Sequence, residues 1–162
     1  MPQVYVSIGS NINREANIRG AVRVLREHYG PLTLSRVYET PAEGFDGAAF
    51  YNLVAGFDTE ESVERLRQTL AAIETAHGRT RNGPRHSPRT LDLDLLLYGG
   101  LVRHDGGLDI PRGEIAKYAF VLGPLAEIAP DLRHPETGVR LGEMWEKFAG
   151  RRELRPVELA LD

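Results

Sequence analysis

Residues 91–95 read Leu91-Asp92-Leu93-Asp94-Leu95, an alternation of apolar and acidic side chains that predicts a β-strand continuing to residue 98. Successive side chains of a strand point to opposite faces, so the leucines should face the core and the two aspartates the other side. At a rise of about 3.3 Å per residue, the two carboxylates lie roughly 7 Å apart on one rigid surface. Like charges this close repel each other, so the pattern favours a positive group between them.

Three more strands are expected before this one. They are residues 4–8, 32–38 and 50–57, which are rich in β-branched and aromatic side chains. A Gly- and Ala-rich loop separates the second of these strands from the third.

Two amphipathic helices are expected between the strands, because apolar residues recur there at helical spacing. The first helix carries Ile18, Val22, Leu25 and Tyr29, begins at Asn11 or Asn13, and ends at Gly30-Pro31. The second helix carries Val63, Leu66, Leu70 and Ile73, has Asp58 or Thr59 as its cap, and stops at Gly78.

The resulting order is strand, helix, strand, strand, helix, strand. Two crossover helices on one face of a sheet predict an α+β fold with a ferredoxin-like βαββαβ core. Beyond it, an apolar run over 119–129 that Pro124 interrupts, and a short helix over 141–148, are expected to cover the other face. We expect a single domain over residues 1–162, in which the residues from about 151 form a peripheral tail.

Composition excludes several classes of protein. The chain has 162 residues, a formal net charge of −3 and no cysteine. Disulfide scaffolds, thiolate metal sites and cysteine nucleophiles are therefore excluded, and a generally basic nucleic-acid binder is disfavoured. No apolar run approaches the roughly 18 residues of a membrane span. We expect a soluble, cytoplasmic protein without a nucleic-acid or membrane partner.

A basic loop directly precedes the acidic strand. Residues 79–89 contain four arginines and no acidic residue, with glycine and prolines between them. Guanidinium groups bind phosphate oxygens in bidentate fashion, and Mg²⁺ takes one or two carboxylates together with substrate phosphates. The combination suits a polyphosphate bound through metal ions. The alternative is a solvated acidic strand face whose Asp92 and Asp94 form surface salt bridges with Arg79 or Arg89, and spacing alone leaves both open.

The chain as a whole resembles the 6-hydroxymethyl-7,8-dihydropterin pyrophosphokinase family of folate biosynthesis. The resemblance rests on collinear motifs, of which the run from Pro88 to Asp94 is close to diagnostic. The motifs are Ile8-Gly9-Ser10-Asn11, Tyr38-Glu39-Thr40-Pro41, Phe50-Tyr51-Asn52, Ile73-Glu74, Gly78-Arg79-Thr80-Arg81, Pro88-Arg89-Thr90-Leu91-Asp92-Leu93-Asp94 and Phe120-Val121-Leu122-Gly123-Pro124-Leu125-Ala126-Glu127-Ile128-Ala129-Pro130.

The resemblance implies transfer of a pyrophosphoryl group from ATP to the hydroxymethyl oxygen of the pterin, with release of AMP. It implies that Asp92 and Asp94 hold two Mg²⁺ ions that bridge the triphosphate. Asp94 is also a candidate acceptor for the hydroxyl proton. Arg79 and Arg89 would clamp phosphate oxygens, which makes them catalytic candidates beside Asp94, because phosphoryl transfer depends mostly on positioning and electrostatics.

The resemblance also implies two substrates, ATP and the pterin, and we expect the protein to be a monomer. The residues expected to bind ATP are Glu74, Arg79, Arg81, Arg89, Leu95 and Arg112. Those expected to bind the pterin are Thr40, Pro41, Phe50, Asn52 and Phe120. The two phenylalanines would sandwich the flat pterin, and Asn52 would bind its edge. The alternative for the phenylalanines is packing in the core. The alternative for Glu74 is an ion pair with Arg81.

Three places depart from the family's usual pattern. His86-Ser87 stands where tryptophan and glycine are common, Arg112-Gly113 where a histidine and often a tyrosine are expected, and Tyr118 where an arginine is frequent. We therefore expect altered ATP contacts around an unchanged metal centre, with Arg112 as a substitute phosphate ligand.

Two other functions remain open at this stage. A polymerase- or cyclase-like palm shares the strand–helix order and uses carboxylates with two metals, but it usually has an acid on the first strand, and residues 4–8 contain none. A non-catalytic RNA-recognition module would stack bases on aromatic side chains within a basic surface. Here the candidate aromatics, Phe50 and Phe120, lie far apart in the sequence and the net charge is negative.

Overall fold

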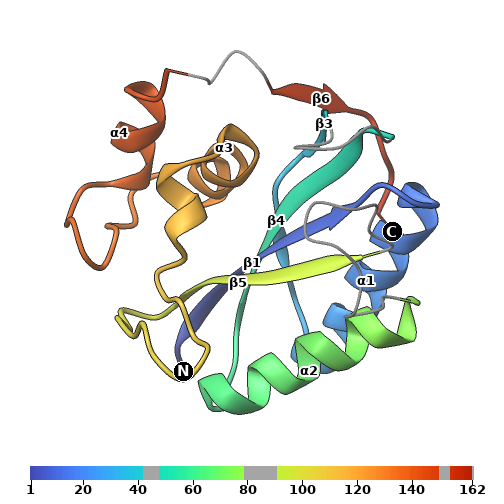
Figure 1. Ribbon diagram of the computed structural model, residues 1–162, viewed down its shortest axis with the longest axis horizontal. Coiled ribbons are helices and arrows are strands. Elements are labelled where there is room, and N and C mark those ends of the chain that lie inside the picture. The colour runs from blue at the N-terminus through green and yellow to red at the C-terminus, as the bar shows by residue number, and fades with distance from the viewer. Residues whose placement is uncertain (42–47, 79–90, 150–153, 162) are drawn as a thin grey trace.

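A sheet of antiparallel strands forms the centre of the molecule. The computed structural model describes residues 1–41, 48–78, 91–149 and 154–161. Within these residues the strands are β1 Gln3–Ser10, β2 Thr33–Leu34, β3 Val37–Thr40, β4 Phe50–Asp58, β5 Asp92–Tyr98 and β6 Arg155–Val157. They follow the order β5-β1-β4-β3-β6, and β2 pairs with β4 as well (Figure 1). The mixed α and β character is confirmed, and the predicted order of elements holds except that the second predicted strand is divided into β2 and β3.

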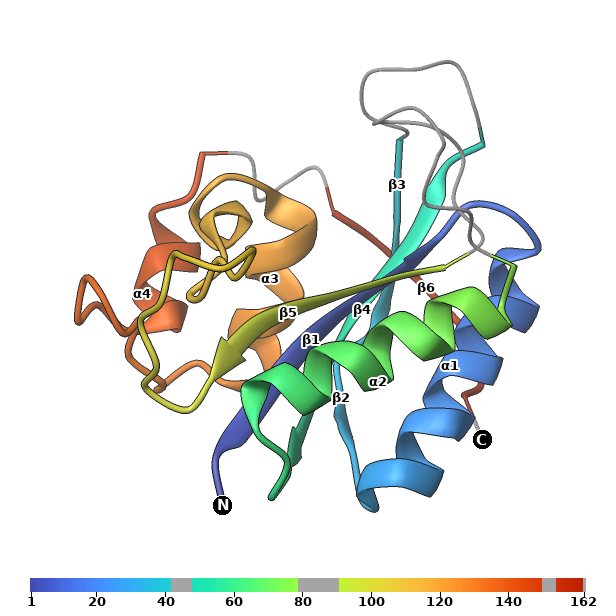
Figure 2. The same ribbon diagram turned by 60° about the horizontal axis from the view of Figure 1, so that its bottom comes forward.

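Helices cover both faces of this sheet. The long helices α1 (Arg14–Tyr29) and α2 (Val63–Ala76) lie on one side, and α3 (Ala119–Ile128) and α4 (Leu141–Glu146) lie on the other (Figure 2). A 3-10 turn, η1 (Gly113–Ala116), leads into α3, which continues across Pro124. Among the described residues, no helix combines the length and the apolar character that a membrane span requires.

Each face of the sheet has its own hydrophobic core. The first core packs the strands against α1 and α2, and its fully buried members include Val4, Val6, Ile8, Ile18, Val22, Leu25, Leu53 and Leu66. The second core packs the strands against α3 and α4, and includes Tyr5, Val54, Leu96, Leu97, Leu122, Leu125 and Leu141. Because alternate residues of β1 and β4 enter different cores, the central strands are apolar along most of their length.

A β-bulge in β5 changes which side chains of this strand face each core. Tyr5 pairs with Leu97 and Val6 with Leu95, which leaves Leu96 as an extra residue on β5. Leu96 and Leu97 therefore both join the second core. Before the bulge the alternation is regular, and Leu91, Leu93 and Leu95 enter the first core as predicted. Asp92 and Asp94 consequently lie on the face that α3 shares.

The predicted single strand over 32–38 is wrong, because Ser35 interrupts it. The Ser35 N–H donates to the Val54 carbonyl, and the Val54 N–H donates to the Ser35 hydroxyl oxygen, both at 2.9 Å. A side-chain oxygen thus replaces a main-chain carbonyl in the ladder. The Arg36 N–H turns away to the Glu127 carboxylate of α3 at 2.8 Å. The segment is divided into β2 and β3 on either side of this break.

The cap of α2 also differs from the prediction. Ser62, not Asp58 or Thr59, occupies the N-cap, and its hydroxyl accepts a hydrogen bond from the Arg65 N–H at 3.1 Å. Thr59 instead accepts from the Glu61 N–H at 3.1 Å. The predicted stop is confirmed, since α2 ends at Ala76 and Gly78 follows with a φ of 84°.

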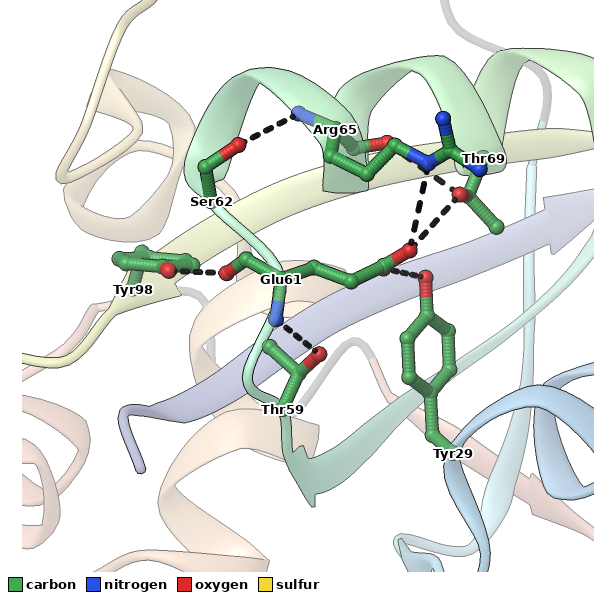
Figure 3. Close-up of polar contacts among 7 residues, drawn as sticks. All are labelled: Tyr29, Thr59, Glu61, Ser62, Arg65, Thr69 and Tyr98. Atoms are coloured by element: carbon green, nitrogen blue, oxygen red, sulfur yellow. Dashed lines mark hydrogen bonds and ion pairs between the residues drawn. The ribbon is translucent and has the colours of Figure 1, made fainter.

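Glu61 links the start of α2 to two other elements (Figure 3). Its carboxylate accepts a hydrogen bond from the Tyr29 hydroxyl of α1 at 2.6 Å, and its carbonyl accepts one from the Tyr98 hydroxyl of β5. Burial and the hydrogen bond to Glu61 raise the pKa of Tyr29, so its hydroxyl remains a donor across the physiological range. These contacts fix α2 against α1 and against the end of β5.

At α1, Asn13 is the N-cap residue, with a φ of 43° and no capping hydrogen bond from its side chain. The other candidate, Asn11, uses its side chain elsewhere. Its Nδ2 donates to the Ala48 carbonyl at 3.0 Å.

The prediction of a peripheral tail requires correction for residues 154–161. Strand β6 pairs with β3, Val157 opposite Val37, and so extends the sheet. Leu159 and Leu161 then pack against the first core, and the Arg19 Nε donates to the Ala160 carbonyl at 2.8 Å. The sparse apolar residues of this segment did not indicate this docking, because a short edge strand depends on an available partner strand rather than on its own pattern.

We expect the fold to lose stability in mild acid through His134. This side chain is buried, and its Nδ1 accepts hydrogen bonds from the Glu136 and Thr137 N–H groups at 3.2 and 3.4 Å. Burial lowers the pKa of His134 below its usual 6.5. The unfolded chain therefore takes up a proton first, and the free energy of unfolding falls as the pH drops through about 6.5.

Urea denaturation at about pH 7.5 and pH 5.5 measures this effect. His134→Asn, whose amide oxygen can replace Nδ1 as the acceptor, should reduce the loss on acidification. His104→Gln is the control with the opposite sign, because hydrogen bonding to Asp109 raises the pKa of His104 and its charged form favours folding at low pH. An identical acid-induced loss in wild type and His134→Asn would contradict the prediction.

Candidate active site

The predicted metal-binding and pterin-binding residues on the strands share one face of the sheet, the face on which α3 and α4 lie, whereas the ATP candidate Leu95 faces the first core. At one end of this face Val54, Leu96 and Leu97 pack under α3. At the other end, where β1 and β3 finish and β4 and β5 begin, the face carries the candidates. They are Thr40 on β3, Phe50 and Asn52 on β4, and Asp92 and Asp94 on β5.

The register of the sheet places one metal candidate, Asp92, and one pterin candidate, Asn52, in the same row across the strands. Gly9 of β1 pairs with Asn52 on one side and with Asp92 on the other. With neighbouring strands about 4.8 Å apart, Asn52 and Asp92 lie roughly 10 Å from each other across the glycine. A Cβ at Gly9 would lie 2.7 Å from the Asn52 Oδ1, so any side chain here would displace the amide. Glycine is required at this position because the Asn52 side chain lies directly over it.

Asn52 is buried and oriented by one hydrogen bond. It is 5 % exposed, and its Nδ2 donates to the Thr40 Oγ1 at 2.6 Å. Phe50, half-buried, lies opposite Thr40 in the ladder, and Pro41 is exposed just beyond β3. The structure thus brings Thr40, Pro41, Phe50 and Asn52 together at one corner of the sheet.

Phe120 comes from a different element. It lies in the first turn of α3, is half-buried, and stacks on Tyr118 with a ring-centroid distance of 5.0 Å and an interplanar angle of 25°. Its ring also packs against the second core. Phe120 therefore packs in the core, which was the alternative interpretation of its role. It also lies on the same side of the sheet as Phe50.

The two aspartates are half-buried, and Asp94 lies close to a guanidinium group. Arg112 Nη2 is 3.6 Å from the Asp94 Oδ1, and Arg112 Nε donates to the Glu114 carboxylate. Burial alone lowers the pKa of Arg112, but the carboxylates of Asp94 and Glu114 outweigh it and raise the pKa above its ordinary value. Arg112 thus lies beside a metal candidate, as its expected role at the triphosphate requires.

The donor chemistry of the aspartate pair suits a hard cation. Both carboxylates project from the same face of β5, with Ser7 and Gly9 of β1 beside them. In the part of the chain that the structure describes, no group of three or more acidic or histidine side chains could hold a metal. A metal here would take two protein carboxylates and would depend on other oxygen ligands, a coordination typical of Mg²⁺ with a bound phosphate ester.

A cavity of about 220 Å³ lies along the outer edge of β5, next to Asp94. It brings together the three predicted ATP-binding residues Glu74, Leu95 and Arg112, which come from α2, β5 and the segment before η1. The other lining residues are Arg67, Leu70, Ala71, Leu93, Asp94, Gly107, Leu108, Asp109 and Ile110.

Glu74 of α2 forms a hydrogen bond with the outer edge of β5 at this cavity. The side chain is 5 % exposed, and its Oε2 accepts the Leu93 N–H at 2.8 Å. A main-chain donor on the outer edge of a sheet is satisfied in this way by a helix side chain. The Arg112 N–H donates to the Leu96 carbonyl at 3.0 Å, so the segment bearing Arg112 is tied to the same edge.

Two charged lining residues, Arg67 and Asp109, were missed by reasoning from the sequence. Arg67, Ala71 and Glu74 follow one another at helical spacing on α2, so the periodicity around Glu74 could have identified Arg67. Asp109 accepts the Gly113 N–H at 3.1 Å, and this hydrogen bond lowers the pKa of Asp109. No sequence pattern indicated Asp109, because its place depends on the fold of the segment around it.

Arg79, Arg81 and Arg89, together with the unusual His86-Ser87, lie outside the described residues. The chain on either side of this segment is described. Helix α2 ends at Ala76, and β5 begins at Asp92 in the row of Gly9 and Asn52.

Comparison with known proteins identifies the family to which the chain belongs. The model of the 7,8-dihydro-6-hydroxymethylpterin-pyrophosphokinase (HPPK) family matches residues 5–130. A 2-amino-4-hydroxy-6-hydroxymethyldihydropteridine pyrophosphokinase of Methylorubrum extorquens is 40 % identical over 136 residues, which cover 82 % of this chain and 85 % of that protein. The enzyme of that name from Pseudomonas aeruginosa is 38 % identical over 146 residues, covering 83 % and 85 %.

Longer proteins match as well. The folic acid synthesis protein fol1 of Pneumocystis carinii is 35 % identical over 157 residues, and this chain spans 21 % of its length. A Plasmodium falciparum HPPK-DHPS crystal structure with pteroate has a TM-score of 0.75 at 12 % identity. The likeness covers 98 % of this chain and 47 % of that one, and it shows the fold alone. The chain described here belongs to the 7,8-dihydro-6-hydroxymethylpterin-pyrophosphokinase family.

Proposed function

We propose that this pyrophosphokinase of folate biosynthesis joins its two substrates, ATP and 6-hydroxymethyl-7,8-dihydropterin, across the row Asp92, Gly9 and Asn52. The register that places a carboxylate on one side of Gly9 and a buried amide on the other is the observation that carries the proposal. A phosphate chain held on the β5 side would then meet a hydroxymethyl group that projects from a pterin on the β4 side. Short distance and fixed orientation are the main requirements of such a transfer.

In this proposal Asp92 and Asp94 are the residues that hold Mg²⁺. Bound Mg²⁺ would neutralise charge on the triphosphate and polarise its β-phosphoryl group. The Asp94 carboxylate takes the proton of the pterin hydroxyl as that oxygen bonds to the β-phosphorus. The bond from the β-phosphorus to the oxygen bridging it to the α-phosphorus breaks, and that oxygen leaves with AMP.

The nucleotide would occupy the cavity at the edge of β5. Glu74, Leu95 and Arg112 line it, which supports their assignment to ATP binding. Arg79, Arg81 and Arg89 belong to the segment that joins the end of α2 to the start of β5, and we propose them as further phosphate ligands, with Arg79 and Arg89 acting in catalysis. The guanidinium groups would share the phosphate charge with the metal ions.

The pterin would lie over the corner formed by Thr40, Pro41, Phe50 and Asn52, with Phe120 as the second stacking ring. Asn52 can donate and accept hydrogen bonds at the edge of the heterocycle, and its bond to Thr40 fixes which way its amide points. Stacking on the two phenylalanines would contribute about 0.5–1.5 kcal/mol per aromatic pair beyond burial.

The proposal also covers the fold of the core, the number of domains and the oligomeric state. The order β5-β1-β4-β3 with crossover helices on one face supports a ferredoxin-like βαββαβ core within one domain over residues 1–162. We also propose a monomeric, cytoplasmic enzyme that binds neither nucleic acid nor membranes. Size-exclusion chromatography with light scattering tests the monomer.

One assay separates this function from the competing ones. Purified protein is incubated with ATP and Mg²⁺, with and without the hydroxymethyl pterin, and AMP and free pyrophosphate are quantified. We expect AMP and pterin diphosphate in equal amounts, only when the pterin and Mg²⁺ are both present. Free pyrophosphate without pterin would favour the palm-type nucleotidyl transfer, and no turnover would favour a binding module.

We expect Arg112→Ala to weaken ATP binding. Arg112 lies in the cavity beside Asp94, and the loss of one charge-assisted hydrogen bond to phosphate raises a dissociation constant about tenfold or more. Calorimetric titration with a non-hydrolysable ATP analogue and Mg²⁺ measures it. Arg140→Ala, which removes an exposed arginine paired with Asp131, is the control. An unchanged dissociation constant in Arg112→Ala would exclude Arg112 as the substitute phosphate ligand.

A further inference from the structure

We propose that Arg14, the first residue of α1, is a positioning residue that sets the start of β4 and thereby holds the Phe50 ring in place for the pterin. The inference rests on the proposed pterin site. It assigns a function to a residue that lies outside that site and would not touch either substrate.

The Arg14 guanidinium contacts both neighbours of Phe50. Its Nη1 donates to the Ala49 carbonyl at 2.9 Å, and its Cζ lies 3.8 Å above the centre of the Tyr51 ring. Its Nη2 pairs with the Glu39 carboxylate at 2.9 Å. Glu39 is the ladder partner of Tyr51, so one side chain ties the start of β4 to β3 on both sides of Phe50.

Within the described residues, side-chain hydrogen bonds hold the backbone directly before Phe50. Residues 48 and 49 are alanines, whose side chains are too small to anchor the chain by packing. Asn11 binds the Ala48 carbonyl at 3.0 Å, and Arg14 binds the next carbonyl. Asn11 of the β1–α1 connection and Arg14 at the start of α1 therefore bind two consecutive carbonyl groups directly before Phe50.

Arg14 lies on the opposite face of the sheet from the pterin candidates. Tyr51 belongs to the first core, under α1 and α2, whereas Phe50 and Asn52 point to the other face. Arg14 can therefore act on the pterin only indirectly, through β4 and, by way of Glu39, through β3. This separation distinguishes a positioning residue from a ligand of the substrate.

The geometry requires arginine rather than any cation. The planar guanidinium binds a carbonyl and a carboxylate at once while its face rests on an aromatic ring. A lysine ammonium could keep the ion pair with Glu39 but not all three contacts together. Arg14→Lys should therefore behave like Arg14→Gln at the pterin site, although it keeps the charge.

The experiment measures pterin and nucleotide binding separately. Wild type, Arg14→Gln and Arg14→Lys are titrated with 6-hydroxymethylpterin, and then with a non-hydrolysable ATP analogue plus Mg²⁺, and KM is determined for both substrates. In both variants we expect the Kd and KM for the pterin to rise about tenfold, through the lost charge-assisted hydrogen bond to the backbone. The nucleotide Kd should stay within about twofold, as for surface substitutions remote from a site.

Two control variants isolate the backbone contact. Arg19→Gln removes an exposed arginine of the same helix, and Glu39→Gln removes the charge partner while leaving the hydrogen bond to Ala49 intact. Both should keep the pterin Kd within about threefold of wild type, because an exposed or partly exposed ion pair contributes little. Thermal unfolding of every variant shows whether it is folded at the assay temperature.

The outcomes are distinct. A selective loss of pterin affinity in both Arg14 variants supports the inference. Unchanged pterin affinity in a folded variant, or equal weakening of pterin and nucleotide, overturns it. If Arg14→Gln unfolds, the folded Arg14→Lys variant decides by the same criteria. Wild type that binds the nucleotide but no pterin would refute the proposed function itself, before any variant is considered.

Discussion

Asp94→Asn is expected to lower kcat for AMP formation about a thousandfold, which corresponds to the loss of metal binding and of a preorganised charge at the reacting phosphate. The substitution keeps the shape of the side chain and removes its charge. Asp94 is only 36 % exposed and lies beside Arg112, so little solvent is present to replace the missing carboxylate. The amide also cannot take the proton of the pterin hydroxyl. Both proposed roles of Asp94 are lost in this one variant.

The measurement is steady-state AMP release at saturating ATP, pterin and Mg²⁺. Titration with Mn²⁺ and the ATP analogue, followed by electron paramagnetic resonance, adds a readout that does not depend on turnover. Asp131→Asn is the matched control, because Asp131 is 91 % exposed and distant from β5 in the sequence. If the kcat of Asp94→Asn stays within about tenfold of wild type, the decrease is too small for the loss of a metal ligand. That result would favour the alternative in which Asp94 forms a surface salt bridge.

Asn52→Ala is expected to raise the pterin Kd about a hundredfold, through the loss of two hydrogen bonds to the edge of the heterocycle. ATP affinity should change by no more than about twofold, because the nucleotide cavity lies beyond β1 at the edge of β5. The selectivity follows from the row in which Gly9 separates Asn52 from Asp92. Fluorescence titration with the pterin and calorimetry with the ATP analogue measure the two constants.

Asn17→Ala provides the comparison for this variant. It deletes the same side chain from α1, where the Asn17 side chain donates to the Ile12 carbonyl at the surface. Asn52 has one described side-chain hydrogen bond, to Thr40, so Asn52→Ala should lose only about 1 kcal/mol of stability and remain folded. A pterin Kd equal to that of wild type would exclude Asn52 from pterin recognition. Parallel weakening of ATP would instead indicate a general disturbance of the sheet.

Patterns within a short stretch of chain predicted the elements well. The alternation of leucine and aspartate in β5 and the helical spacing of Leu66, Leu70 and Ile73 were sufficient, because burial of one face is the same requirement in any fold. Predictions failed where a distant partner decides. The Val54 main chain divides 32–38 into two strands at Ser35. The cap of α2 is a different case, because Ser62 binds the Arg65 N–H only three residues away and two residues upstream have equally suitable side chains.

Some residues of the candidate site were predicted from the sequence, and others were found only in the structure. Glu74, Leu95 and Arg112 were expected at the nucleotide, and one cavity contains all three. Arg67 and Asp109 line the same cavity and were missed. Arg14 was missed as well, because its importance comes from the carbonyl of Ala49, some 35 positions along the chain, and not from any motif of its own.

By itself, the sequence determined the two long helices, the acidic strand and the family, since each depends on residue types at fixed spacing along the chain. Only the tertiary structure decided that Asn52 and Asp92 flank Gly9, that β6 completes the sheet edge, and that Arg14 contacts both sequence neighbours of Phe50. The physical reason is that strand register and side-chain contacts between distant segments follow from packing two cores at once. No local pattern specifies that packing.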